Sequence, residues 1–147
     1  MAGSSGLDMA SSQELFDELA FYTLAQPRPP FVHQLAIDAF TAQRADAATK
    51  PIAVVFALVG LYLHVEFRFT GLRVQQAHMQ LARERKQWPR LPLPEQRGAV
   101  EVSDVLAAAP GAARNAMIHD WCVSVWGAWS ASRPAIADLV RRELHVG

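Results

Sequence analysis

The sequence predicts an all-α protein, a compact single-domain bundle of six or seven helices around one central apolar helix, with a proline-rich strap. Two observations carry this prediction. Residues 51–67, PIAVVFALVGLYLHVEF, are uncharged from Ile52 to Leu63, so a helix here is apolar on every side and needs other elements around it. Elsewhere apolar residues recur at helical spacing, and the best strand segment, residues 100–102, is too short to form a sheet.

Length and composition indicate one soluble domain. The chain has 147 residues, and we expect residues 1–10 to form a flexible tail before a single helical domain at 11–147. The central segment holds about 12 to 14 apolar residues, fewer than the ~20 that cross a bilayer, so we expect no membrane association. Fourteen basic and fourteen acidic residues balance, which argues against nucleic acid as a partner. Residues 67–97 nevertheless carry seven basic against two acidic residues.

Cysteine usage and the N-terminus point to the cytoplasm. The single cysteine, Cys122, excludes an intramolecular disulfide framework and a cysteine-based zinc ribbon. The first ten residues, MAGSSGLDMA, lack the basic start and the apolar run of an export signal.

The first half of the chain predicts three helices. Ser11 and Ser12 cap a helix that ends near Gln26, before a cluster of three prolines. A second helix runs from that cluster to about Arg44. Thr49 is expected to cap the central helix, and Gly60 within it costs about 1 kcal/mol relative to alanine, which indicates close approach of another helix.

The second half predicts the strap and the remaining helices. Thr70 caps a helix over residues 72–87, and the segment 88–99, WPRLPLPEQRGA, contains three prolines and is expected to be an extended strap held by Trp88, Leu91 and Leu93. Three helices follow. They are a short one capped by Ser103 and Asp104, an aromatic-rich one at about 113–130, and a last one that restarts at Ser132 and Pro134.

Three histidines on apolar faces of successive helices form the candidate site. If these helices pack as antiparallel neighbours, His33, His64 and His78 come within reach of one another. Three histidines with an open fourth position are the ligand set of catalytic zinc centres. The sequence therefore predicts a divalent metal site, such as zinc, with Glu66 or Asp38 as a fourth ligand or as the base that activates water.

The alternative is that each histidine is a hydrogen-bonded structural residue, because no HxxxH or HExxH spacing places two ligands on one helical face. A metal-free ligand pocket is a third possibility. If Asp38 is buried it needs a partner, and Arg73 or a histidine is the expected one.

Other chemical signals are weaker. His119 and Cys122 lie three residues apart, close enough for thiolate activation, although a buried structural cysteine is commoner. The basic run 83–90 beside Trp88 suggests a solvated helix end before it suggests nucleic-acid binding. Neither a serine nucleophile elbow, a phosphate-binding loop nor a dinucleotide glycine fingerprint is present.

Four phrases carry a resemblance to a known family: HQLAIDAFTAQ (33–43), KPIAVVFALVGLYLHVE (50–66), TGLRVQQAHMQLA (70–82) and DVLAAAPGAARNAMIHDWCVSVWGAW (104–129). In them the chain resembles a bacterial family catalogued as a domain of unknown function. The resemblance implies a small helical protein and assigns no activity. A looser likeness in architecture is to the DinB-like metal-binding bundles, whose paired histidines one turn apart this chain lacks.

Two functions therefore stay open. The first is an enzyme, in which the histidines bind a metal that activates water for a small-molecule substrate. The second is a non-catalytic binding or assembly protein that acts through an apolar or basic surface as a homodimer.

Overall fold

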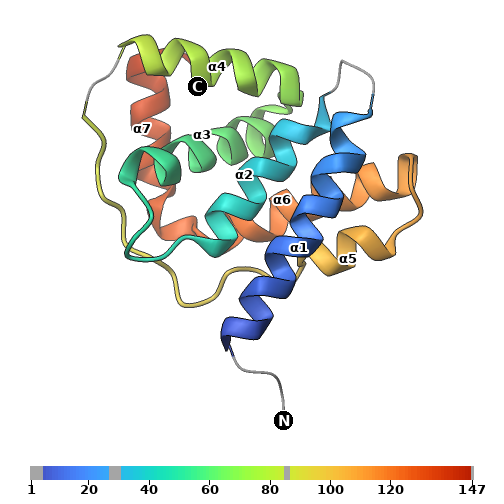
Figure 1. Cartoon of the computed structure of the whole chain (residues 1–147). Helices are drawn as coiled ribbons and strands as arrows, with labels where there is room; N and C mark the ends of the chain where they lie inside the picture. The colour runs from blue at the N-terminus through green and yellow to red at the C-terminus, as the bar shows by residue number, and fades with distance from the viewer. Residues whose placement is uncertain (1–4, 27–30, 85–86, 147) are drawn as a thin grey trace.

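The computed structural model describes residues 5–26, 31–84 and 87–146, and within these ranges it contains helices and no strands. The elements are α1 (Ser5–Leu24), α2 (Val32–Arg44), α3 (Pro51–Phe67), α4 (Gly71–Glu84), α5 (Val102–Ala107), α6 (Ala112–Ala128), a 3-10 turn η1 (Ser130–Ser132) and α7 (Arg133–Leu144). They pack as a compact bundle, with α3 in the middle (Figure 1). The predicted all-α fold is confirmed. None of these helices is long and apolar enough to cross a membrane.

Helix α3 has the predicted bounds and packs against α2, α4, α6 and α7. Every residue from Ala57 to Leu63 is buried, a stretch of about two turns, so no side of the helix faces solvent there. At Gly60, an added Cβ would overlap Asp38 of α2 and touch Val74 of α4. The predicted close approach at this glycine is therefore confirmed.

The ends of the helices depart from the predictions in three places. Helix α1 begins at Ser5, before the predicted Ser11 and Ser12 cap. Thr49 does not cap α3, because its hydroxyl accepts a hydrogen bond from the backbone N–H of Asp46 (3.0 Å) in the preceding turn. Helix α5 is capped by a Glu101–Asp104 box, without Ser103. The Thr70 cap is confirmed, since its hydroxyl accepts from the Arg73 N–H at 3.2 Å.

Helix α6 and its C-cap residue, Trp129, supply the two largest fully buried side chains. Trp121 and Trp129 are fully buried, and each indole N–H has an acceptor. The Trp121 indole donates to Gln43 Oε1 (2.9 Å), and the Trp129 indole donates to the Ala42 carbonyl (3.2 Å). Because both acceptors lie near the end of α2, these bonds fix the crossing of α2 and α6.

The predicted strap runs along the outside of the bundle from α4 to α5 (Figure 1). Trp88 and Leu91 pack against the core as expected, whereas Leu93 is 40% exposed. The main anchor is Arg97, which no pattern in the sequence marks. Its Nη1 donates to three carbonyls at the end of α2, those of Ala42 (3.3 Å), Gln43 (3.2 Å) and Ala45 (2.8 Å). The guanidinium thereby satisfies carbonyl groups that the helix end leaves unbonded.

Replacing Arg97 with methionine is expected to destabilise the fold by about 2 kcal/mol, because several hydrogen bonds from a charged donor are lost and carbonyls at the end of α2 lose their partner. Urea denaturation followed by tryptophan fluorescence measures the effect. Arg90→Met is the matched control, since Arg90 is an exposed arginine on the same strap. Equal midpoints for the two variants would contradict the anchoring role of Arg97.

Candidate functional site

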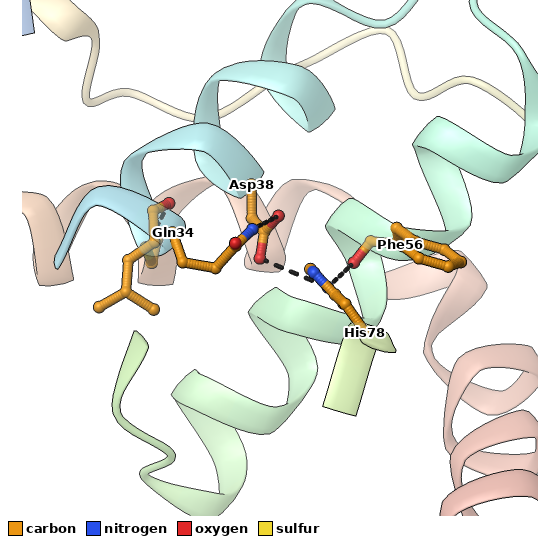
Figure 2. A network of polar contacts seen from close by, with 6 residues as sticks. Gln34, Asp38, Phe56 and His78 are labelled. Atoms are coloured by element: carbon orange, nitrogen blue, oxygen red, sulfur yellow. Dashed lines mark hydrogen bonds and ion pairs between the residues drawn. The ribbon is translucent and has the colours of Figure 1, made fainter. Parts of the chain in front are cut away.

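The buried polar site of the bundle is formed by Asp38 of α2 and His78 of α4. Asp38 is 3% exposed and His78 is 9% exposed. Gln34 Nε2 donates to Asp38 Oδ1 (3.1 Å), and His78 Nε2 lies 3.7 Å from Asp38 Oδ2. Figure 2 shows the imidazole edge directed between the carboxyl group and the backbone carbonyl of Phe56. The buried Asp38 thus has the expected histidine as a neighbour, but the hydrogen bond that it accepts comes from Gln34, which the sequence did not indicate.

The bond to Phe56 determines the state of His78. Its Nε2 lies 2.7 Å from the Phe56 carbonyl, which can only accept, so Nε2 carries the hydrogen. Burial lowers the pKa of His78 from 6.5 to about 4, against the opposing effect of the carbonyl. His78 is thus a neutral donor at pH 7, and its Nε2 has no lone pair for a metal.

Asp38 is a buried acid whose neutral form is favoured. Burial raises its pKa well above the usual value, and the Gln34 hydrogen bond opposes this only in part. Its Oδ2 is the one buried side-chain oxygen or nitrogen without a hydrogen-bond partner among the described residues. This oxygen lies directly against Gly60, where a Cβ would overlap it.

His64 of α3 pairs with His119 of α6. His64 Nδ1 lies 2.8 Å from the Phe69 carbonyl, and its Nε2 lies 2.9 Å from His119 Nδ1. Since the carbonyl can only accept, His64 carries its hydrogen on Nδ1 and presents the Nε2 lone pair to His119. Burial, and then the proximity of His119, lower the pKa of His64. The neutral ring with a carbonyl-bonded Nδ1 is the form in which histidines bind metals.

His33 of α2 forms its hydrogen bond with α1, away from the Asp38–His78 and His64–His119 pairs. Its Nδ1 is 2.8 Å from the Thr23 hydroxyl, which in turn donates to the Ala20 carbonyl (3.1 Å), so this histidine ties α2 to α1. The structure does not bring His33, His64 and His78 together. In the described ranges, no three histidine, cysteine, aspartate or glutamate side chains form a group that could hold a metal ion.

The two predicted bases also occupy different places. Asp38 is the buried acid described above. Glu66 of α3 accepts from Arg133 at the start of α7 (2.5 and 2.8 Å) and from the Trp126 indole N–H (2.8 Å). The Arg133 hydrogen bond is the main cause of its lowered pKa, with burial opposing. Glu66 is therefore an ionised side chain that joins α3, α6 and α7.

Cys122 is a structural thiol. It is fully buried, its sulfur lies 3.6 Å from the Leu35 carbonyl, and burial raises its pKa. The thiolate activation considered from the sequence needs the opposite shift.

Two cavities lie away from these polar groups. The larger, of about 430 Å³, lies between the α2–α3 connection and the strap, and the smaller, of about 200 Å³, lies between α4 and the C-terminal residues. The larger has the size of a ligand pocket, with Val54, Leu91 and Leu93 as apolar walls and Asp46 and Arg90 as charged groups. A small-molecule ligand stays a prediction.

Sequence reasoning missed His119 as a partner of His64. The two residues lie 55 positions apart, and helical periodicity within α6 places His119 on its solvent face, where no core pattern marks it. The sequence drew attention to His119 only through its spacing to Cys122, and this spacing says nothing about a partner on another helix.

Comparison with known proteins adds a family and no activity. No curated protein and no solved structure matches the chain. The likeness to DinB-like bundles stays an analogy of architecture. One family model, described as a family of unknown function (DUF5946), matches residues 4–130, which include α2, α3, α4 and α6 and therefore both the Asp38–His78 pair and the His64–His119 pair. Because the match spans most of the chain, the protein belongs to the DUF5946 family.

Proposed function

We propose that this protein binds a divalent metal ion such as zinc through His64 and His119. The single observation that supports the proposal is the 2.9 Å separation of His64 Nε2 and His119 Nδ1. A zinc ion about 2.0 to 2.1 Å from both nitrogens would subtend about 90° at this separation, and the tetrahedral angle requires the nitrogens to move apart by only about 0.4 Å. The proposal keeps the metal and His64 of the sequence prediction and replaces His33 and His78 by His119.

The chemistry of the pair suits metal binding at neutral pH. Without metal, one hydrogen of the neutral His119 ring lies between the two ring nitrogens, and a metal that enters would require this hydrogen to move to Nε2 of His119, a change of tautomer. The lowered pKa of His64 keeps its ring in the neutral form that a metal requires. Two protein ligands leave positions for water, whose pKa falls when zinc binds it. Activation of water by the bound metal therefore remains part of the proposal. Asp38 and Glu66, the bases predicted from the sequence, have no role in it.

Either His64→Ala or His119→Ala is expected to weaken zinc binding at least tenfold. Isothermal titration of untagged, chelator-treated protein with zinc chloride measures this affinity. His145→Ala is the matched control, since His145 is an exposed histidine beyond the end of α7. Unchanged affinity in His119→Ala, with loss in His33→Ala and His78→Ala, would refute this pair and restore the ligands predicted from the sequence.

A further inference from the structure

His119 of the proposed metal pair lies on an exposed face of α6 that carries little charge. Four residues at helical spacing form this face together with His119, and all are exposed, namely Ala112, Ala116, Val123 and Gly127. Val123 is 43% exposed, and a Cβ at Gly127 would meet nothing within 4 Å. Solvent-facing sides of helices are normally polar. On this face of the described helix, the only charged or ring-nitrogen groups are His119 and Asp120, at its centre.

This arrangement is self-complementary. If a second copy packs antiparallel on the same face, with the twofold axis between positions 119 and 120, Ala116 of each copy opposes Val123 of the other. Ala112 opposes Gly127 in the same way. Each position along the contact therefore pairs alanine with glycine or with valine, so that the two helices can approach closely. At the centre, His119 opposes Asp120 of the second copy, so each ring faces a carboxylate. A twofold interface requires this kind of reciprocal matching.

We infer that a second copy of this chain docks on α6 and completes the metal shell with its Asp120. The inference rests on the proposed metal site and adds its third ligand. Each dimer then holds two metal ions, each bound by His64 and His119 of one copy and Asp120 of the other. Two histidines and a carboxylate are the ligand set of catalytic zinc sites, which keep the fourth position open for water. A single copy cannot build this site, because no third ligand group joins the two histidines within the described residues.

The test combines sedimentation velocity with zinc titration, on the full chain in chelator and in zinc chloride. We expect the wild type to be a monomer in chelator and a dimer with one zinc ion per chain in zinc chloride. Asp120→Asn and Val123→Glu should both stay monomeric in zinc chloride. Both variants should also bind zinc at least tenfold more weakly, although neither changes a histidine. Glu18→Gln, which removes an exposed acid on α1, is the control and should behave as the wild type.

The outcomes separate the two proposals. A monomer that binds one zinc, with the same affinity in Asp120→Asn, would overturn the inference and leave the histidine pair intact. A dimer that forms equally in chelator and in Asp120→Asn would overturn the role of Asp120 as a ligand. Absence of zinc binding in every variant and in the wild type would overturn the proposed function itself.

Discussion

Gly60→Ala is expected to destabilise the fold by about 3 kcal/mol, although alanine is the better helix former by about 1 kcal/mol. The new Cβ would overlap Asp38 Oδ2 and lie 3.0 Å from a methyl group of Val74. Both neighbours belong to buried side chains of packed helices, so neither can move aside without displacing α2 or α4. Urea denaturation in chelator, followed by circular dichroism, measures the loss.

Two further variants show whether the cause is the contact with Asp38. Gly127→Ala is the matched control, since this glycine is also within a helix but a Cβ there meets open space. It should stabilise the protein by up to about 1 kcal/mol. The double variant Asp38→Ala with Gly60→Ala should recover about 2 kcal/mol relative to the sum of the single changes, because the closest contact is gone. Additive effects, or a Gly60→Ala variant as stable as Gly127→Ala, would refute the packing argument.

Asp38→Asn is expected to gain stability over the wild type as the pH rises. The folded-state pKa of Asp38 is raised, so its contribution to stability is fully present below the unfolded-state pKa of 3.8 and is lost as the pH rises through the folded-state pKa. An amide of the same shape never ionises. The difference in unfolding free energy should therefore grow in favour of Asn above about pH 4, with a limiting slope of about 1.4 kcal/mol per pH unit.

His78 contributes a pH dependence of the opposite sign. Its folded-state pKa is lowered from 6.5 to about 4, so its contribution is present above pH 6.5 and is lost as the pH falls toward 4. This contribution is common to both proteins and largely cancels in their difference. Urea denaturation at pH 4.5, 6 and 8 measures that difference, which would stay constant if Asp38 were ionised throughout this range in the folded protein.

The central helix could be predicted from the sequence because its signals are local. An uncharged apolar run with a proline in its first turn specifies both the helix and its burial, and the observed bounds, Pro51–Phe67, are the predicted ones. The Thr49 cap failed for an equally local reason, because the hydroxyl had a second possible partner in the Asp46 turn. The local sequence does not show whether the Thr49 hydroxyl accepts from the first turn of α3 or from the Asp46 N–H.

The candidate site was only partly predictable, because its contacts depend on how the helices are rotated against one another. Periodicity placed His33, His64 and His78 on apolar faces. An apolar face can contact several neighbouring helices, however, and periodicity does not show which of them a given side chain meets. His64 faces α6, His78 faces α3 at Phe56, and His33 faces α1. The pairing of His64 with His119 needed the crossing of α3 and α6, which the buried tryptophans of α6 help to set and which no spacing in the sequence reveals.

The burial of α3 on every side has a consequence for synthesis on the ribosome. Its partners α6 and α7 end at Ala128 and Leu144, so the apolar helix leaves the ribosome well before its covering helices exist. At roughly 5 to 20 residues per second, this interval is on the order of ten seconds. Chain collapse takes about 100 µs or less, so nascent α3 has ample time to associate with other nascent chains. The delay gives a ribosome-associated chaperone several seconds in which to bind the nascent apolar helix.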